Sequence, residues 1–382
     1  MRNMLRTWGL AAATAVLPFA AHAQAPSWNW DGDVRVRFDN QDYTHAKSVD
    51  RLMLRVRMNA TGTLADGKVD WGVGLTTGAS NPVSPDVVMA GGNISGVANN
   101  NKAGDIGFAK AYIGFKPVDR LRITVGKMNN PFWETDGIFC PDLFPEGLAL
   151  SYVISPGAKG DMFTKVKDTL AWFQVANSST FTATTWMLGD QISTTAKSGT
   201  DLGLGFYYYS GLNAGYVAGK TSSIAAGLDS QAGNQTITVG GVSSFVKDTM
   251  GVISGKVRHP FSIGKNHFPL IVSGEVFDNV VVTNQSLGYE ARLDMPRFLG
   301  NGSFNFTWRQ EDSQSTFSPW ADSKFGAGTG YHAGLRADYS VPIYKNVTFE
   351  AMAFHFDRFW VVTPTPTARS TNRILAQVMA AF

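Results

Sequence analysis

The stretch RLMLRVRMNA, residues 51 to 60, alternates strictly between two kinds of side chain. One parity holds Leu52, Leu54, Val56, Met58 and Ala60, and the other holds Arg51, Met53, Arg55, Arg57 and Asn59. Because successive side chains of an extended chain point to opposite sides of a sheet, this pattern predicts a β-strand. The period alone leaves two possibilities open. A soluble sandwich would bury the leucines, whereas a membrane barrel would expose them to lipid and turn the arginines toward a water-filled lumen.

The first residues have the composition of an export signal. Residues 1 to 23 carry Arg2 and Arg6, then the apolar run LAAATAVLPFAA, then AHA before Gln24. We therefore expect residues 1–23 to be a cleaved signal peptide and residues 24–382 to form one mature domain. The signal holds two arginines and no acids, so the net charge falls from +3 to about +1. Overall charge is thus uninformative about partners.

The composition is typical of a β-protein. The chain has 40 glycines, 25 phenylalanines and 10 tryptophans among 382 residues, and only 16% of its residues are charged. A single cysteine, Cys140, excludes an internal disulfide framework. No apolar run after the signal approaches the roughly 20 residues of a membrane helix. If the chain enters a membrane, strands must do the crossing.

Connections between the expected strands alternate in length. The expected strands 33–39, 51–64, 69–78, 107–116 and 120–127 are separated by a loop near 40–50, the turn ADGK at 65–68, a long loop near 79–104 and the turn 117–119. A second long loop follows at 128–150, and the Asp-Gly pair of ADGK suits a two-residue hairpin. Short turns at one end and long loops at the other are typical of outer-membrane barrels. Similar alternation continues to the end of the chain, and we expect about sixteen strands.

The final segment, RILAQVMAAF at 373–382, decides between sandwich and barrel. It alternates, ends on Phe382, and places Ile374, Ala376, Val378 and Ala380 on the same face. A closed barrel must end on a strand that pairs with the first, because unpaired edge groups in hydrocarbon cost several kcal/mol each. The sequence therefore predicts an all-β fold, a closed antiparallel transmembrane β-barrel with short periplasmic turns and long external loops. The terminal Phe382 also resembles the mark by which the barrel-assembly machinery recognises outer-membrane proteins.

The barrel fold decides which side chains of residues 51–60 face lipid and which face the lumen. An arginine on the lipid face near mid-bilayer costs roughly 2 to 4 kcal/mol, so the arginines should face the lumen. The same logic turns Val34, Val36 and Phe38 outward, together with Ala109, Ala111, Ile113 and Phe115. The predicted basic residues that line the pore are Arg35, Arg37, Arg51, Arg55, Arg57, Lys110, Arg120 and Arg122.

The segment GKMNNPFWETDGIFCPDLFPEGLAL, residues 126–150, resembles the "putative porin" family of Gram-negative bacteria, which is distantly similar to phosphate- and polyphosphate-selective porins. FAKAYIGFKP, DVRVRFDN and RLMLRVRMN are also similar to it, so the likeness is clearest over the first third of the chain. The resemblance implies a 16-stranded channel in the Gram-negative outer membrane. In the phosphate-selective relatives, lumen arginines and lysines guide anions, but this chain lacks their dense lysine ladder.

These observations favour a porin for passive diffusion of small hydrophilic or anionic solutes, with a mild anion preference and contact with outer-membrane lipid. The alternative is that the arginines only pair with lumen carboxylates and hold the interior together. The candidate carboxylates are Asp33, Asp39, Asp70, Glu290, Asp294, Glu311, Asp338 and Glu350. Both arrangements can coexist in one pore.

The loop at 128–150 is long and carries much apolar surface for an external loop. We expect it to fold into the lumen and narrow the pore. The candidate constriction residues are Asn130, Pro131, Phe132, Trp133, Glu134 and Asp136. Alternatively, the loop caps neighbouring strands or contacts another subunit, for example in a homotrimer.

Two further function classes compete with a pore. A barrel hydrolase needs a histidine beside a nucleophile or acid, and His332, near Arg336 and Asp338, is the best candidate, although a lumen hydrogen-bonding role fits it better. HExxH, strand-linked GxSxG and phosphate-loop motifs are absent, and no metal-ligand cluster occurs. An adhesin or structural barrel would bind through its loops, but loops 79–104 and 312–328 are polar and suit solvated surface. We expect no enzyme activity, no cofactor or metal, and no nucleic-acid binding.

Overall fold

The computed structural model describes most of the chain after the predicted signal peptide, which lies outside the described residues. The described residues are 27–44, 48–78, 83–89, 106–133, 135–155, 162–177, 184–213, 234, 236–239, 242–265, 267–322, 324–325, 331–358 and 369–382. Within these ranges, no helix is both long and apolar enough to cross a membrane.

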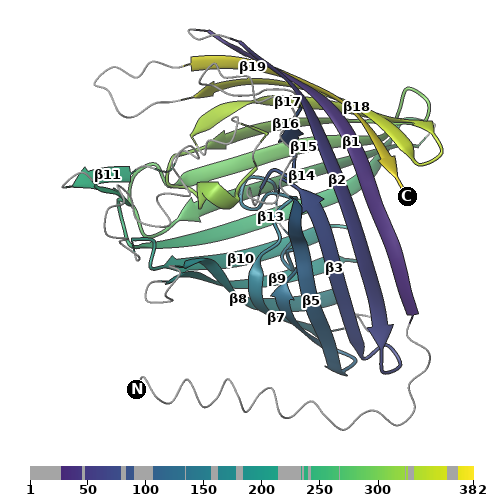
Figure 1. Ribbon diagram of the computed structural model, residues 1–382, viewed down its shortest axis with the longest axis vertical. Helices are drawn as coiled ribbons and strands as arrows, with labels where there is room; N and C mark the ends of the chain where they lie inside the picture. The colour runs from purple at the N-terminus through teal and green to yellow at the C-terminus, as the bar shows by residue number, and fades with distance from the viewer. Residues whose placement is uncertain are drawn as a thin grey trace.

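Sixteen antiparallel strands form one closed sheet (Figure 1), which confirms the predicted barrel and its strand number. They are β1 (Ser27–Tyr43), β2 (Val49–Leu64), β3 (Val69–Thr77), β5 (Ile106–Val118), β6 (Leu121–Lys127), β7 (Glu146–Ser155), β8 (Phe163–Asn177), β9 (Thr184–Ala196), β10 (Asp201–Ser210), β13 (Thr249–Ile263), β14 (Phe268–Asn279), β15 (Leu287–Phe298), β16 (Gly302–Glu311), β17 (His332–Tyr344), β18 (Val347–Arg358) and β19 (Arg369–Ala381). The short β4 (Val87–Val88) extends the sheet beside β2, and β11 (Thr236–Val239) with β12 (Val242–Phe245) forms a separate hairpin.

Pairing of β1 with β19 closes the barrel, as the final segment predicts. Their register sets Val36 opposite Val378, and Gly32 and Phe382 exchange two backbone hydrogen bonds of 3.1 Å. A Cβ atom on Gly32 would lie 2.6 Å from the Phe382 ring, so glycine makes room for that ring. The two strands lie side by side in Figure 1, where the C-terminus marks the end of β19. Closure leaves neither strand with an unpaired edge along this seam.

Connection lengths separate the two ends of the barrel as predicted. Seven connections of two to seven residues lie at one end, here called the short-turn end, and eight connections of five to 38 residues lie at the long-loop end. The turn after β2 differs in detail from the two-residue hairpin expected. Leu64 pairs with Val69, so four residues form the turn, and Ala65, Asp66 and Gly67 all have positive φ angles of 51°, 54° and 81°.

The side chains of β1 alternate between the outside and the inside of the barrel. Val34, Val36 and Phe38 are 38%, 42% and 44% exposed on the outer face, whereas Arg35 and Arg37 are buried on the inner face. Strand β2 follows the same rule, with Leu52 and Met58 exposed and Arg55 buried. The apolar outer face therefore belongs to lipid, and the charged inner face to the lumen.

Strand β5 contains a correction to the predicted facing. Between Gly74 and Leu75 of β3 the register shifts, because Ala109 is an extra residue in β5. Phe108 is consequently exposed at 62% and Ala109 is buried at 5%, so the predicted outward position of Ala109 is wrong. A bulge of this kind changes parity within one strand, and alternation alone does not reveal it.

Two carboxyl groups break the apolar outer face. Asp168 on β8 shares its parity with Leu170 and Trp172, and Asp190 on β9 shares its parity with Leu188. The two carboxyl groups are diagonal neighbours across the β8–β9 pair, because Asp168 lies opposite Ile192 and Asp190 lies opposite Leu170. Both positions fall near the middle of their strands, where lipid is least tolerant of charge.

Replacing Asp190 by leucine should stabilise the folded barrel in lipid. We expect Asp190→Leu to raise the free energy of unfolding in vesicles by about 1 to 2 kcal/mol, because a polar group leaves the hydrocarbon. Urea titration in phospholipid vesicles measures this change. Asp201→Leu is the matched control and should destabilise, because Asp201 binds Arg258 at 3.0 Å on the inner face. A loss of stability in Asp190→Leu would show that polar groups, and not lipid, cover this face.

Candidate functional site

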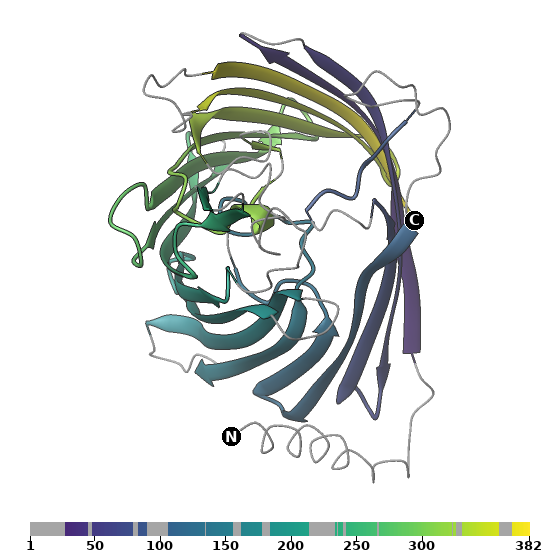
Figure 2. The ribbon, with the colours of Figure 1, turned by 60° about the vertical axis from the view of Figure 1, so that its left-hand side comes forward.

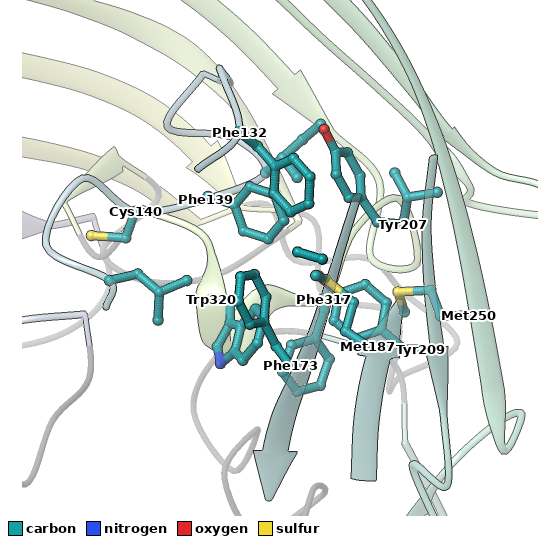
Figure 3. Packing of buried hydrophobic residues seen from close by; sticks show 14 of the residues in the cluster. Phe132, Phe139, Cys140, Phe173, Met187, Tyr207, Tyr209, Met250, Phe317 and Trp320 are labelled. Carbon is teal, nitrogen blue, oxygen red and sulfur yellow. The ribbon is translucent and has the colours of Figure 1, made fainter. Parts of the chain in front are cut away.

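The loop between β6 and β7, residues 128–145, lies inside the barrel. Its Phe132 and Phe139 rings each lie 5.1 Å from the ring of Tyr207, which is fully buried on the inner face of β10. Gly189 on β9 leaves space for Phe132, since a Cβ atom there would lie 2.5 Å from that ring. Figure 3 shows these rings packed together with side chains of the wall. The apolar surface of the loop is therefore buried within the barrel.

The buried apolar cluster joins the loop to one side of the wall. Its loop members are Met128, Phe132, Ile138, Phe139, Cys140 and Leu143, and its wall members include Ala171, Phe173, Met187, Tyr207, Tyr209, Met250, Val252 and Phe277. The wall members come from β8, β9, β10, β13 and β14, and β7 adds Ala149. Burial of this area stabilises the inward position of the loop, at roughly 1.5 to 3 kcal/mol for each large side chain. Burial also raises the pKa of the Cys140 thiol, which keeps it unreactive.

Polar contacts fix the loop backbone to the same side. The side chain of Gln191 accepts a hydrogen bond from the Trp133 N–H at 2.8 Å and donates one to the Trp133 carbonyl at 2.9 Å. Glu275 accepts the N–H of Thr135 at 3.0 Å. The Lys256 ammonium lies 4.4 Å from the centre of the Trp133 ring, a cation–π contact.

The same loop also reaches other parts of the wall. Asp136 binds Arg336 of β17 at 3.3 Å, and Asp142 binds Arg57 of β2 at 3.2 Å. The loop therefore touches β2, β9, β14 and β17, so it crosses the lumen. Figure 2 shows chain segments inside the ring of strands.

The loop after β16 enters the lumen as well, which corrects the expectation that 312–328 is solvated surface. Phe317 and Trp320 join the apolar cluster, and residues 313–322 are all buried. Asn234 donates to the carbonyls of Ser313 and Thr316 at 2.8 Å each. The Ser315 hydroxyl donates to the Asp312 carbonyl at 2.8 Å, and the Ser313 hydroxyl donates to the Gln285 side chain at 2.6 Å, so the polar composition of this loop does not indicate exposure to solvent.

A third inward segment, residues 83–89, lies within the loop expected to be solvated at 79–104. Asp86 of this segment binds Arg35 at 2.6 Å and Arg37 at 2.5 Å. Burial opposes ionisation of Asp86, but the two guanidinium groups outweigh it and hold the pKa of Asp86 below its usual value. Residues 79–82 and 90–104 lie outside the described residues.

The model of a family described as "Putative porin" matches residues 28–239, more than half of the chain. The chain belongs to this family. No curated protein sequence matches the porin significantly.

Solved bacterial structures are similar to this chain at low sequence identity. The high-pH structure of Pseudomonas putida OprB covers 93% of this chain and 94% of its own, with 9% identity and a TM-score of 0.56. OmpT of Vibrio cholerae, in a trimer form, covers 94% of this chain and all of its own, with 9% identity and a TM-score of 0.48. A mutant porin of Rh. blastica covers 93% of this chain and all of its own, with 11% identity and a TM-score of 0.48.

The structure pairs most of the predicted pore-lining arginines of the porin with carboxylates. Asp33 binds Arg55 and Arg57 at 2.6 Å each, so the expected alternative of internal pairing describes this part of the wall. The remaining pairs join Arg35 and Arg37 to Asp86, Arg51 to Asp39, and Arg122 to Asp70. Lys110 is half-buried on β5, and no carboxylate among the described residues lies within ion-pair distance of it. Arg120 is exposed in the turn after β5, so its predicted place on the lumen wall is wrong.

Another part of the wall carries an excess of acid. Arg309 of β16 is buried, binds Glu290 at 2.5 Å, and lies 4.8 Å from the ring of Phe325. Arg336 binds Asp338 at 2.8 Å. Around these two arginines gather six carboxylates, Asp136, Glu275, Glu290, Glu311, Asp322 and Asp338. Buried charges of this kind persist only with such partners.

The candidate constriction residues lie together in the loop. Asn130, Phe132 and Asp136 line a cavity of about 280 Å³ with Phe144. Trp133 contacts Gln191 as described, and the Pro131 carbonyl accepts a hydrogen bond from Lys167 at 3.5 Å. Glu134 lies outside the described residues.

Sequence reasoning missed Lys165 and Lys167 of β8. The charges that act on Lys167 are those of Lys165 and Arg122, and we call these three residues the β6–β8 basic cluster. All three lie near the short-turn end of their strands. The alternation of KVK at 165–167 was a usable signal, but a bulge beside Lys165 obscured the strand pattern.

His332, the candidate for a hydrolase, packs against aromatic rings. Its ring lies 5.0 Å from Phe325 and 6.2 Å from Phe356, and it is 1% exposed. Arg336 binds Asp338 and Asp136 instead of supporting a base. This environment is that of a packed inner-wall residue.

Truncation of Phe139 should loosen the loop. We expect Phe139→Ala to destabilise the inward position by about 3 to 5 kcal/mol, since it leaves a cavity among Phe132, Tyr207 and Trp320. Limited proteolysis within residues 128–145 measures the effect. Trp172→Ala, on the outer face, should leave cleavage unchanged; equal protection in Phe139→Ala would contradict the packing argument.

The contact of Asp86 should survive mild acid. A carboxylate with a lowered folded pKa stabilises the folded state above its unfolded pKa of about 3.9, and that stabilisation is lost only as pH falls through the folded value. The difference in free energy of unfolding between wild type and Asp86→Asn should therefore stay constant from about pH 8 to 5 and shrink below about pH 4. Urea titration across this range measures it, and a decline already at pH 6 would contradict the direction of the shift.

Proposed function

We propose that the chain forms a water-filled pore for passive diffusion of small hydrophilic solutes, with a preference for small anions. The family and the closed barrel support a pore in the bacterial outer membrane. The β6–β8 basic cluster is the observation that carries the anion preference. It holds three cations, and only Arg122 has a carboxylate partner among the described residues.

The arginines of β1 and β2 contribute less to the selectivity than the β6–β8 basic cluster does. Arg35, Arg37 and Arg55 are almost completely buried and are ion-paired with Asp86 or Asp33, so their guanidinium groups meet little water. The Arg122 side chain is 42% exposed, and Lys165 is exposed. Uncompensated charge at an exposed wall attracts counter-ions. The range of this attraction is about 8 Å in physiological salt.

The position of the cluster beside the inner loop strengthens its effect. Lys167 contacts Pro131 of the loop, so the cluster borders the segment that crosses the lumen. An ion that passes between this segment and β8 comes close to all three cations. Narrow passages focus the field of charged walls more than wide ones do.

A second candidate function is a barrel closed to solutes that acts as a structural protein or adhesin. The observation that favours it is the apolar cluster, in which Phe139, Phe317 and Trp320 fill space inside the ring of strands. Assembly as a homotrimer and recognition of Phe382 by the barrel-assembly machinery of a Gram-negative cell remain predictions under either function.

Reversal potentials across a KCl gradient test the pore and its selectivity. Purified protein in a planar bilayer should give discrete conductance steps with chloride favoured. Lys165→Gln with Lys167→Gln should lower the chloride-to-potassium permeability ratio about twofold or more, because two uncompensated charges leave the passage. Lys345→Gln, in an exposed turn, is the control and should leave the ratio unchanged.

Two other results of the bilayer recordings would contradict parts of the proposal. Steps with potassium favoured would keep the pore and reject the role of the cluster. Folded, heat-modifiable protein that gives no steps would reject the pore and support the closed barrel.

A further inference from the structure

Arg35 and Arg37 of β1 together hold one carboxylate. Arg35 donates through Nε at 3.2 Å and through Nη2 at 2.6 Å to Oδ1 of Asp86, and Arg37 donates through Nη1 at 2.5 Å to Oδ2. Both arginines are buried, at 4% and 3% exposure. The carboxylate comes from segment 83–89 and not from the wall itself. The two arginines thus form a ready site for a carboxylate.

Asp86 does not saturate this site. Nη2 of Arg37 is buried and has no hydrogen-bond partner in the part of the chain that the structure describes. Its Nε donates to Gln377 at 2.7 Å. The guanidinium groups of Arg35, Arg55 and Arg373 lie near enough to act on Arg37, and the carboxylate that binds it is that of Asp86. A buried donor without an acceptor is unfavourable, so the site suits a ligand with more acceptor atoms than Asp86 provides.

Apart from the ion pairs of Asp86, hydrogen bonds to β2 and to loop 128–145 hold the segment that carries it. The Met89 N–H donates to the Leu52 carbonyl at 2.7 Å, and the Cys140 thiol donates to the Val83 carbonyl at 3.2 Å. Val87 and Val88 pair with Leu54 and Met53, and the Pro85 carbonyl accepts a hydrogen bond from Thr77 at 3.0 Å. Val83 is its contact with the apolar cluster, whereas loop 128–145 contributes six buried apolar side chains. The ion pairs of Asp86 are therefore a principal attachment of this segment to the wall.

We propose that the Arg35–Arg37 pair binds a solute carboxylate that carries a second acceptor group, and that Asp86 is a built-in competitor displaced by that solute. The inference rests on the proposed pore, because the solute must reach the site through the lumen. A dicarboxylate replaces the Asp86 carboxylate with one group and offers the other to Nη2 of Arg37. The competitor sets the solute concentration at which the site is occupied.

Block of the chloride current by malonate tests the competitor. In a planar bilayer, Asp86→Asn should lower the half-blocking malonate concentration at least tenfold relative to wild type, because the internal carboxylate no longer competes. Acetate, with a single carboxylate, should block more weakly than malonate. Asp201→Asn removes the same charge from another inner ion pair and should change the block less than twofold. Equal shifts in both variants, or none in Asp86→Asn, would overturn the inference.

A disulfide across β2 and β4 provides an independent variant in case Asp86→Asn folds poorly. Met53 and Val88 are register partners, so Met53→Cys with Val88→Cys should hold segment 83–89 in place when oxidised. Malonate block should then disappear under oxidation and return on reduction. Block that is indifferent to the redox state would contradict displacement of Asp86.

A stability measurement separates failure of this inference from failure of the pore. Malonate should raise the urea midpoint of Asp86→Asn in vesicles and leave that of Arg37→Gln unchanged, because a ligand stabilises the state that binds it. If no variant conducts but this shift appears, the site stands and the pore is rejected. If the protein conducts with chloride favoured but malonate acts equally on all variants, the pore stands and the site is rejected. If inorganic phosphate acts more strongly than malonate, the ligand class assigned here is wrong.

Discussion

Closure of the sheet between β1 and β19 is the constraint on which the rest of the molecule depends. Once closed, the sheet has an inside and an outside, and every strand must send one parity to each. The charged parity of β1 and β2 is then enclosed, which leaves arginines such as Arg35 and Arg55 away from bulk water. Enclosed guanidinium groups need carboxylates nearby, and the wall supplies only some of them. The inner segments supply the others, through Asp86 and Asp142. Closure therefore explains why the side chains of the strands alternate between apolar and charged, and why segments that carry carboxylates lie in the lumen.

The sequence predicted what depends on period and missed what depends on long-range contact. Alternation in 51–60 and 373–382 is a local property, so strand existence, facing and closure followed from it. The extra residue at Ala109 shifts parity without any change in composition, and the pairing of Asp86 with Arg35 joins residues whose approach no local pattern encodes. Arg120 has the same parity as Arg122, but it lies in the turn, one residue before β6 begins. Loop 312–322 looked solvated because its residues are polar, yet Asn234 shows that such residues also bond to buried backbone.

The three inner segments are held in the lumen by different kinds of contact. Loop 128–145 is held mainly by aromatic packing against β8 to β10, with Gln191 and Glu275 fixing its backbone. Loop 312–325 adds Phe317 and Trp320 to that packing and Asp322 to the charges around Arg309. Segment 83–89 is held by the two ion pairs of Asp86 and by backbone pairing with β2. Apolar packing does not depend on the charge of a neighbour, whereas a buried guanidinium group requires a charged partner. The contacts of β1 with segment 83–89 therefore depend on the charge of Asp86, and the aromatic contacts of the other two segments do not.

The seam between β1 and β19 differs from every other strand pair in the distance along the chain that it spans. The other fifteen neighbouring pairs join barrel strands that follow one another along the chain, and most of these pairs are hairpins with short connections. The seam instead sets Asp33 opposite Ala381. Bringing together ends separated by hundreds of residues costs about 3 kcal/mol more conformational entropy than closing a hairpin of about 15 residues. Most strand pairs of the barrel therefore form with a small loss of conformational entropy, and the β1–β19 pair forms with a large one. The ring of Phe382 packs over Gly32 at this seam.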